Sequence, residues 1–402
     1  MSGAERVVQK LAELMVMRGN HAVVITGQPD GGRQTREVNG VRVIYTPIKN
    51  IYAPLTKESE AASALRKGIW HLRDSYNSAM ASELSELIKV ENPDVVNTHN
   101  LMGFSSAAIK AAKINHIPVV HTIHDQYLLC PRSTMFKNGH NCHKQCAVCR
   151  IYALPRKVST NHINAVIGVS QFILDRHIKF GYFPGATRHV IYNGIQIKEL
   201  VPRQFFATER PFRFGFLGQI RQTKGLEQLV DAFIALRKPG IELHIGGRGD
   251  LEYEKKLKRK AEYHASIRWC GHVNASSFLR SIDVLVVPSL WHDTAPLVLI
   301  EALKEGTPVL ASNRGGIPEF VSENTGWLYS PDRSQGLSCA MEKCVNSVSE
   351  LLNFSRAAQI LAKQFDEAKF VDGYDTIFRE LSVRNATRDV LHTGLKNESN
   401  VR

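Results

Sequence analysis

The sequence predicts an α/β protein with two parallel-sheet domains. Short β-branched runs such as AVVIT (22–26), DVVNT (94–98) and DVLVVP (283–288) alternate with helical patterns along the chain. Near-continuous apolar strands separated by helices indicate parallel sheets that are covered on both faces. A chain of 402 residues is long enough for two separate cores.

The elements form two blocks that meet near residues 195–211, where VPRQFFATERP reads as a linker. We therefore expect an N-terminal domain at 1–200 and a C-terminal domain at 201–365. A helix at 366–381 is expected to return to the N-terminal domain, and a polar tail at 382–402 is expected to be mobile. The predicted strands are 22–26, 41–45, 94–98, 118–123, 165–169 and 189–192 in the first block, and 212–217, 241–246, 283–288 and 308–312 in the second.

The opening segment MSGAERVVQKLAEL predicts an amphipathic helix. The helix should begin near Ala4, because Ser2 can cap it and Glu5 then lies beside the positive end of the helix dipole. The charges in this segment argue against a signal peptide, and no apolar run has the length of a membrane span, so the expected address is the cytosol. The apolar positions that should face a sheet at helical spacing are Val7, Val8, Leu11, Leu14 and Met15.

The net charge of +13 is concentrated in the first half of the chain. Residues 1–200 hold 24 Lys and Arg against 14 Asp and Glu, whereas residues 201–402 hold 27 against 24. A basic half suggests an anionic partner, either a phosphorylated ligand or an anionic membrane surface, and a solvated basic surface is the alternative. Nucleic acid is not an expected partner, because the sequence shows no interleaving of aromatic and basic residues and no nucleic-acid-binding signature.

The segment DTAPLVLIE (293–301) has an acid at each end of a largely apolar run. The preceding strand ends at Pro288, and Pro296 stands at the expected first position of a helix, where its missing N–H costs nothing. Parallel sheets bind ligands at their carboxyl edge, and the free N–H groups of a helix start suit phosphates. Because a carboxylate accepts two O–H bonds, Asp293 can hold sugar hydroxyls and Glu301 a ribose diol. The alternative is a loop cap at Asp293 and a solvated Glu301.

Three further turns follow predicted strands. In FGFLGQIRQTKGLEQLV (214–230), Arg221 and Lys224 stand just before a helix, and two cations at a helix start suit a diphosphate. HIGGRGD (244–250) and NRGGIPE (313–319) are glycine-bearing turns after other strands. Each turn is a weak signal alone, whereas together and in this order they are specific.

With these turns in this order, the chain resembles glycosyltransferase family 4, the retaining nucleotide-sugar transferases of GT-B fold. The resemblance covers nearly all of residues 1–380 and is strongest in PSLWHDTAPLVLIEALKEGTPVLASNRGGIPEFVSENTGWLY (288–329). It implies two Rossmann-like, doubly wound domains that face a cleft. It also implies transfer of a sugar from a nucleotide diphosphate with retention of configuration and without a divalent metal.

The acid pair matches the E-x7-E element of the family, with Asp293 in place of the first Glu. The match implies that Glu301 holds the ribose and Lys224 the diphosphate. Gln219 stands where the family has an arginine, and Arg221 is the candidate substitute. The resemblance assigns donor contacts to Gly3, Gly218, Arg221, Lys224, Gly247, Thr294, Ala295, Pro296, Leu297 and Glu301, and catalytic roles to His124, Asp293 and Glu301.

The stretch VVHTIHDQYLLCP (119–131) resembles the family segment that carries the active-site histidine. This match places His124 at the donor sugar, and a histidine satisfied at a strand end is the alternative. His99, His121 and Asp125 are the acceptor-side candidates.

SGAER (2–6) matches the G-G-x-E-R loop of the family, which grips the donor phosphates or the acceptor. In the family this loop follows a first β-strand, and here no strand precedes it. We therefore expect the N-terminal sheet to lack its first strand, with a gap beside residues 22–26 or 94–98 and unpaired backbone groups on both neighbours. A start site assigned too late and an inactive remnant are the two explanations, and both predict a poorly soluble and weakly active chain.

Four cysteines cluster as C-x11-C-x3-C-x2-C, with His140 and His143 among them. In a cytosolic chain this density suits a tetrahedral structural zinc site with four thiolates, or with three thiolates and one imidazole. Free thiols and disulfides are the alternatives. The candidate ligands are Cys130, Cys142, Cys146 and Cys149.

The sequence thus predicts a retaining, hexosyl-type glycosyltransferase of cell-surface polysaccharide or glycolipid synthesis. Its expected partners are a nucleotide-diphosphate sugar, a glycan or lipid-linked acceptor and an anionic membrane surface, and its expected location is the cytoplasm, peripheral on the inner face of the membrane. No cofactor is expected for catalysis. Another enzyme of GT-B fold, such as an epimerase or a phosphorylase, and an inactive nucleotide-sugar-binding homologue are the alternatives.

Overall fold

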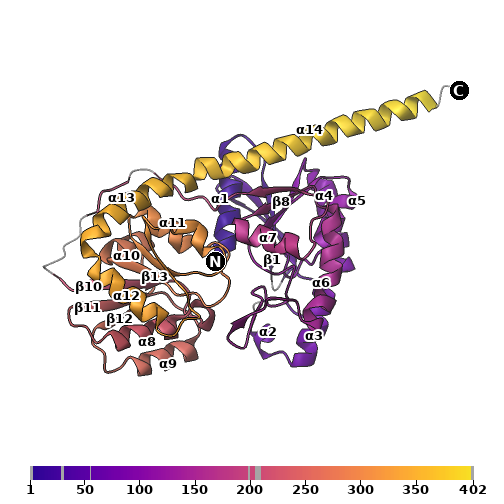
Figure 1. Ribbon diagram of the computed structural model, residues 1–402. Helices are drawn as coiled ribbons and strands as arrows, with labels where there is room; N and C mark the ends of the chain where they lie inside the picture. Colours follow the sequence, from indigo (N-terminus) through magenta and orange to yellow (C-terminus); the bar gives the residue numbers. More distant parts are fainter. Residues whose placement is uncertain (1–2, 29–30, 55, 198–199, 204–209, 400–402) are drawn as a thin grey trace. The chain divides into compact units, whose positions relative to one another are not determined.

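The computed structural model describes residues 3–28, 31–54, 56–197, 200–203 and 210–399, with the backbone alone for 386–399. The chain forms two compact units (Figure 1). Unit 1 comprises Met1–Ser133, Lys144–Tyr192 and Phe370–Arg402, and unit 2 comprises Thr134–His143 and Asn193–Lys369. The main segment of unit 2 thus begins at Asn193, a few residues before the predicted boundary, and a short segment of the first half of the chain also belongs to this unit.

The sheet of unit 1 is split into two parts. A four-stranded parallel part has the order β4-β5-β8-β9, and its strands β5 and β8 are buried along their whole length, as their continuous apolar sequences predict. A three-stranded part has the order β1-β3-β2, with β2 antiparallel to β3. The strands are β1 (Val23–Gln28), β2 (Gln34–Val38), β3 (Val41–Pro47), β4 (Val96–Thr98), β5 (Val119–Ile123), β8 (Ala165–Gly168) and β9 (Thr187–Val190).

The split falls where the sequence predicted a missing strand. Among the described residues, β1 pairs only with β3, and β4 pairs only with β5. Each of these strands therefore has one edge without a ladder partner, and the predicted gap beside residues 22–26 and 94–98 is confirmed.

Helix α1 (Gly3–Met17) begins one residue before Ala4 and buries Val7, Leu11 and Met15, so the predicted apolar face is confirmed at these positions. Val8 and Leu14 are half-buried, and Ser2 lies outside the described residues. The other helices of unit 1 are α2 (Lys57–Ala61), α3 (Ala64–Ser75), α4 (Ser78–Glu91), α5 (Ala107–Ile114), α6 (Ala147–Ser159), η1 (Thr160–His162) and α7 (Gln171–Lys179).

Unit 2 is built on a parallel sheet of six strands in the order β12-β11-β10-β13-β14-β15. The strands are β10 (Phe212–Leu217), β11 (Ile241–Gly246), β12 (Ile267–Gly271), β13 (Val284–Val287), β14 (Val309–Ser312) and β15 (Gly326–Tyr329), and a short hairpin of β6 (Phe136–Lys137) and β7 (His140–Asn141) accompanies them.

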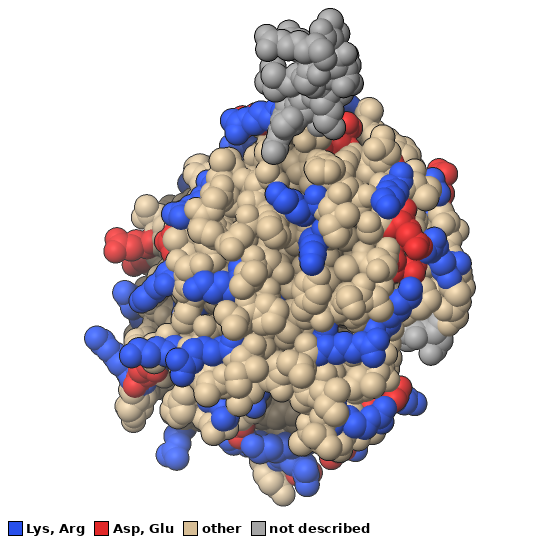
Figure 2. Space-filling view, turned by 90° about the vertical axis from the view of Figure 1, so that its right-hand side faces the viewer, with Lys and Arg blue, Asp and Glu red and all other residues tan. Residues whose placement is uncertain are grey.

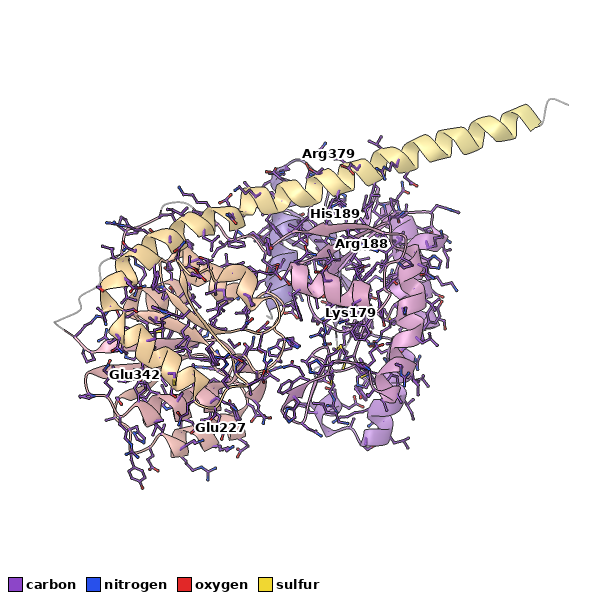
Figure 3. All side chains as sticks on the ribbon, in the orientation of Figure 1. Lys179, Arg188, His189, Glu227, Glu342 and Arg379 are labelled. Carbon is purple, nitrogen blue, oxygen red and sulfur yellow. The ribbon has the colours of Figure 1, made fainter. Side chains whose placement is uncertain are left out.

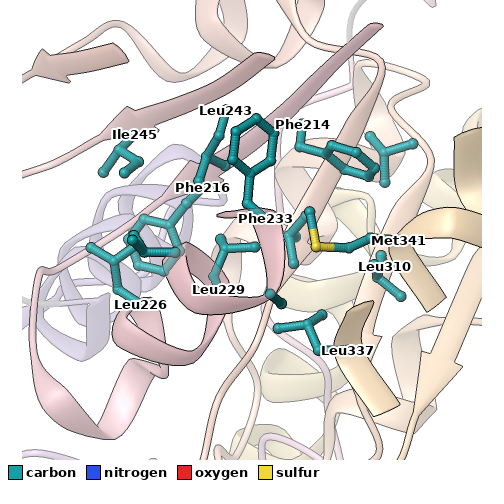
Figure 4. Close-up of a cluster of buried hydrophobic side chains, with 14 of the residues drawn as sticks. Phe214, Phe216, Leu226, Leu229, Phe233, Leu243, Ile245, Leu310, Leu337 and Met341 are labelled. Atoms are coloured by element: carbon teal, nitrogen blue, oxygen red, sulfur yellow. The ribbon is translucent and has the colours of Figure 1, made fainter. Parts of the chain in front are cut away.

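Helices α8 (Leu226–Leu236) and α12 (Gly336–Asn346) cover one face of this sheet (Figure 4). Their apolar residues, such as Leu229 and Met341, are fully buried against Phe214 and Leu243 of the strands. Such burial stabilises a fold by about 1.5–3 kcal/mol per large side chain. The remaining helices are α9 (Leu251–Lys260), α10 (Ala275–Ser281), α11 (Leu297–Lys304), α13 (Leu351–Ala362), η2 (Gln222–Lys224), η3 (Ile317–Phe320), η4 (Val348–Glu350) and η5 (Lys363–Phe365).

The last helix, α14 (Glu367–Ser399), is much longer than the predicted helix at 366–381. Residues 382–399 contain no proline, so nothing in the sequence stops the helix, and the predicted helix end at 381 is wrong. The mobility of the tail stays a prediction. From Phe370 on, the helix belongs to unit 1. Arg188 and His189 of β9 and residues of α14 line a common pocket close to Arg379 (Figure 3). No helix within the described residues is both long and apolar enough to cross a membrane.

Candidate functional site

The candidate donor site lies at the carboxyl edge of the unit 2 sheet, where the loops after β10, β11, β13 and β14 emerge together. At two turns of this site, a glycine allows one backbone segment to lie directly against another. A Cβ at Gly247, whose φ is +132°, would lie 1.8 Å from the carbonyl oxygen of Gly218. A Cβ at Gly225, whose φ is +72°, would lie 1.9 Å from the carbonyl oxygen of Pro288. Larger residues are therefore excluded at these turns.

Lys224 and Asp293 form an ion pair in this site. Lys224 ends η2, and its Nζ lies 2.5 Å from Oδ2 of Asp293 in the loop after β13. The Asp293 side chain is only 7% exposed, and Ser289 Oγ donates to the same oxygen at 3.4 Å. Sequence reasoning gave the two residues separate contacts with a donor, whereas the structure brings them together.

The turn after β14 fixes the backbone around Asp293. The N–H of Gly316 donates to the carbonyl oxygen of Asp293 at 2.8 Å, and the N–H of Gly315 donates to Nδ1 of His292 at 3.2 Å. Gly315 has a φ of +59°, and a Cβ there would lie 2.1 Å from the same carbonyl oxygen. The glycine pair of NRGG is therefore needed for the close approach of two loops.

The first turn of α11 follows this loop. Pro296 is the N-cap of α11 and not, as predicted, its first helical residue. The helix ends at Lys304, one residue before the predicted end at Glu305. Thr294, Ala295 and Pro296 are buried, and Glu301 is half-buried in the second turn.

Asn141 is a residue that sequence reasoning missed. Its Nδ2 donates to the carbonyl oxygen of Leu290 at 2.7 Å, and its Oδ1 accepts from the N–H of His292 at 2.8 Å. The side chain of β7 thus bridges two residues of the loop that leads to Asp293. An asparagine amide has one donor and one acceptor side, which suits this double contact.

Replacing Asn141 by alanine is expected to weaken UDP binding about tenfold, because the loss of two hydrogen bonds costs roughly 1–2 kcal/mol and frees the loop. Titration calorimetry measures the effect. Lys137→Ala in the same hairpin is the control, because its side chain is exposed. Equal affinities of N141A and the control would contradict a positioning role for Asn141.

Three histidines of unit 1, His99, His121 and His124, gather at β4 and β5. Nδ1 of His99 lies 2.9 Å from Nε2 of His124, and the two rings are stacked. Nδ1 of His121 lies 2.8 Å from Thr98 Oγ1. A small pocket is lined by His99, Asn100, His121, Thr122, Ile123, His124, Asp125, Tyr127 and Leu128. The predicted acceptor-side residues therefore share one site with His124.

Burial makes these histidines hard to protonate. It lowers the pKa of His124 to about 4 and, with the charges of His177 and His124, that of His121 to about 3. Burial and the neighbouring His124 lower the pKa of His99 well below its usual range. Burial raises the pKa of Asp125 to about 6. At neutral pH the His124 ring is therefore uncharged and suited to a hydrogen bond with a hydroxyl group.

The stability of unit 1 is expected to fall as the pH decreases from about 6.5 to about 4. In this window the unfolded chain binds protons that the folded histidines do not, and one pKa unit corresponds to about 1.4 kcal/mol. Asp125 acts in the opposite direction, because its pKa is raised in the folded chain. The stability that Asp125 contributes is fully present below the pKa of the unfolded chain and is lost as the pH rises through about 6. Melting curves from pH 7.5 to 4.5 test this expectation: His121→Asn should flatten the decline and Asp125→Asn should steepen it. A melting temperature independent of pH would contradict it.

A buried ion pair connects α3, α6 and the segment after β5. Asp74 and Arg156 are both fully buried, with Nη2 of Arg156 3.3 Å from Oδ2 of Asp74. The hydroxyl of Tyr127 donates a hydrogen bond to the same oxygen at 2.6 Å. The carbonyl oxygen of Tyr127 accepts a hydrogen bond from Nη1 of Arg156 at 2.6 Å, and the guanidinium of Arg156 stacks on the Tyr127 ring. Burial raises the pKa of Asp74, although Arg156, Tyr127 and the N–H of Gly103 lower it. The network holds the segment that carries His124 against two helices.

The cysteine cluster is only partly assembled. The sulfur atoms of Cys130 and Cys149 lie 3.6 Å apart, and hydrogen bonds to Cys130 and Cys146, together with burial, raise the pKa of Cys149. These three residues belong to unit 1, whereas Cys142 belongs to unit 2. In the part of the chain that the structure describes, no group of three or more His, Cys, Asp or Glu residues is arranged to hold a metal ion. Within unit 1, Cys149 thus contacts both Cys130 and Cys146.

Zinc binding itself stays a prediction, and the metal content of the purified chain decides it. About one zinc per chain would confirm it, and less than half an equivalent would overturn it.

Two further donor candidates are exposed at the ends of helices. Gly3 is exposed at the first residue of α1, and Arg221 is exposed just before η2. Their contacts with a donor stay predictions.

Two family models and one relative match this chain over most of its length. The family model Glycosyltransferase Family 4 matches residues 1–199, and Glycosyl transferases group 1 matches residues 198–360. A 42.6 kDa protein in the cps region of Klebsiella pneumoniae is 30% identical over 322 residues, which cover 80% of this chain and 83% of that protein.

Two solved structures share the fold. Sucrose-phosphate synthase from Thermosynechococcus elongatus has a TM-score of 0.74 at 17% identity, with 95% of this chain and 94% of that chain covered. HepE from Anabaena, in complex with UDP and glucose, has a TM-score of 0.65 at 18% identity, with 94% and 96% covered.

Proposed function

The chain belongs to glycosyltransferase family 4, and on that premise we propose that it moves a hexose from a nucleotide-diphosphate sugar to a glycan or lipid-linked acceptor with retention of configuration. The observation that carries this proposal is the Lys224–Asp293 pair at the carboxyl edge of the unit 2 sheet. A cation and a carboxylate in one loop cluster suit a ligand that carries both phosphates and hydroxyl groups.

Donor binding replaces the ion pair with two better-matched contacts. The diphosphate takes Lys224, because two phosphates carry more negative charge than one carboxylate. Asp293 is then available to accept hydroxyl groups of the sugar, and Glu301 those of the ribose. When the bond to the sugar breaks, charge develops on the diphosphate, and Lys224 stabilises it without moving far. Arg221 adds a second cation from the same turn.

The neutral His124 supports a contact with the transferred sugar, as the resemblance to the family implies. A protonated histidine would need its own counter-charge in this half-buried position, whereas a neutral one needs only a hydrogen-bond partner. The cationic side chains at the diphosphate leave no need for a divalent metal in the proposed reaction, so turnover in excess EDTA should equal turnover without it.

Two similar proteins suggest which donor to test first and in which process the chain acts. HepE is described with UDP and glucose, which supports UDP-glucose among the first donors to test. The similar Klebsiella pneumoniae protein belongs to a cps region, which supports a role in cell-surface polysaccharide synthesis.

The deciding experiment offers the full chain UDP- and GDP-hexoses with lipid-extracted and oligosaccharide acceptors, and follows nucleotide release together with the labelled sugar. We expect labelled acceptor in the same amount as released nucleotide, with the anomeric configuration of the donor preserved in the NMR spectrum. Nucleotide release without labelled acceptor would indicate a hydrolase, and conversion of the donor sugar would indicate an epimerase. Tight UDP binding with no turnover on any acceptor would favour the inactive binding homologue.

A further inference from the structure

Two neighbouring helices of unit 1 expose rows of large apolar side chains. On α3 these are Leu65, Ile69 and Leu72, spaced at i, i+4 and i+7, so they lie on one side of the helix. On α6 they are Val148, Ile151, Leu154 and Val158. Each of these seven side chains is at least half exposed. Single exposed apolar residues are common on protein surfaces, whereas two adjacent rows mark an interaction surface.

The two helices pack directly on each other, so the rows form one face. The hydroxyl of Tyr152 donates to the carbonyl oxygen of Gly68 at 3.3 Å, and the Tyr152 ring lies 5.8 Å from that of His71. One turn further on, the buried pair of Asp74 and Arg156 joins the same helices. We call the exposed surface of α3 and α6 the α3–α6 face.

The exposed charges on α3 and α6 themselves are of one sign. Arg66 and Arg73 are exposed on α3, and Arg150 is exposed on α6. Arg66 pairs with Glu58 of α2. The only acid within either helix is Asp74, which is buried. Figure 2, which faces this side of unit 1, shows a broad tan area bordered by blue side chains with few red ones.

We propose that the α3–α6 face docks on an anionic lipid surface, with the helices lying in the plane of the headgroups. This inference goes beyond the transferase reaction and does not depend on it. Helices with apolar residues on one side and Lys and Arg beside them bind the boundary between headgroups and acyl chains. Each Lys or Arg near an anionic surface strengthens such binding about fivefold. The apolar rows supply insertion, and the arginines supply the preference for negative lipid.

A second copy of the chain is the other candidate occupant. In a symmetric dimer the same face meets itself, which would bring the arginines of both copies together without an acid on either helix to pair them. An anionic lipid surface matches these charges instead.

The docking face is mechanically connected to the histidine site. Tyr127, three residues after His124, contacts both Asp74 and Arg156, which lie on the inner sides of the docking helices. Docking would therefore hold a lipid-linked acceptor at the surface of the unit that carries the proposed acceptor-side residues.

Vesicle sedimentation of the full chain tests the proposal. We expect binding to vesicles of phosphatidylcholine with 30 mol% phosphatidylglycerol, and at least tenfold weaker binding to phosphatidylcholine alone or in 0.5 M salt. The double variant Leu72→Asp, Ile151→Asp should bind at least tenfold more weakly, as should Arg73→Glu, Arg150→Glu. Matched controls in unit 2, Ile360→Asp and the pair Arg259→Glu, Arg356→Glu, should bind like the unchanged chain, because these residues are equally exposed. UDP affinity and circular dichroism should be unchanged in every variant.

Three outcomes would overturn the proposal: no binding to anionic vesicles, equal loss in the unit 2 controls, or undiminished binding of L72D/I151D. Analytical ultracentrifugation tests whether a second copy of the chain binds the α3–α6 face. A dimer that L72D/I151D converts to monomers, without any vesicle binding, would assign the face to contacts between copies. Because UDP binding is measured on the same samples, failure of the membrane proposal is distinguishable from failure of the proposed reaction.

Discussion

Replacing Arg156 by leucine is expected to destabilise unit 1 by about 3–5 kcal/mol, the usual cost of removing one partner from a buried ion pair. The guanidinium of Arg156 contacts the carboxylate of Asp74 and the carbonyl and ring of Tyr127, and none of these groups is open to water. Without Arg156, Asp74 must stay charged in an apolar environment or take up a proton. Within the described structure, the Tyr127 hydroxyl and the Gly103 N–H remain as hydrogen-bond donors to Asp74, and neither carries a charge.

Amide hydrogen exchange suits this measurement, because a chain with two units has no single free energy of unfolding. Protection of peptides from α3 and α6 should drop in R156L, whereas peptides from α8 and α12 should keep theirs. Arg150→Leu, six positions earlier on the same helix and exposed, should change protection by less than about 0.5 kcal/mol. The double variant Asp74→Leu, Arg156→Leu should be less destabilised than the sum of its single variants, because it leaves no unpaired charge. A loss below about 1 kcal/mol in R156L would show that the pair is not a major contact of unit 1.

The strands that sequence reasoning found are those with continuous apolar runs. β5, β8, β13 and β14 are buried along their whole length, and their sequences reflect this directly. β2 was missed because QTREV is polar and mostly exposed. Its one sequence signal was the Asn-Gly pair at 39–40, which has positive φ at both residues and closes the hairpin to β3.

β12 and β15 were missed for a related reason. The sequence IRWCG alternates buried and exposed positions at one edge of the sheet, and GWLY, at the other edge, begins with glycine and has no β-branched residue. Edge strands are short or half exposed, so their composition resembles that of loops. The outer limits of a sheet are therefore harder to predict than its centre.

The site was predictable as a set of turns but not as a set of contacts. The order of strands placed Lys224 and Asp293 at one edge of the sheet, because the loops after parallel strands emerge together. No local pattern could show that the two side chains pair, since this depends on rotamers and on the Gly315 turn 22 residues later in the chain. The contact of Asn141 with Leu290 joins residues 149 positions apart, and that of Asp74 with Arg156 joins residues 82 positions apart, so neither leaves a local signal.

Replacing Lys224 by alanine is expected to weaken UDP and GDP binding by roughly 1.5–3 kcal/mol, about 10- to 150-fold in Kd, because a charged hydrogen bond to the diphosphate is lost. The carboxylate of Asp293, which is paired with Lys224 at 2.5 Å, would then face the phosphates without its cation. The double variant Lys224→Ala, Asp293→Asn should therefore bind nucleotides more tightly than Lys224→Ala alone. If the two residues made independent contacts, the double variant would bind more weakly than either single variant.

Glu301→Ala should show a loss of similar size for the nucleotides, but inorganic pyrophosphate, which has no ribose, should compete equally well in E301A and the unchanged chain. In K224A pyrophosphate should lose its effect. Calorimetry with UDP, GDP and pyrophosphate measures all three effects. Lys238, a half-buried lysine whose Nζ donates to Oδ1 of Asn346, is the control for charge. If K224A and E301A both bind the nucleotides as tightly as K238A does, the donor site is not at this edge of the sheet.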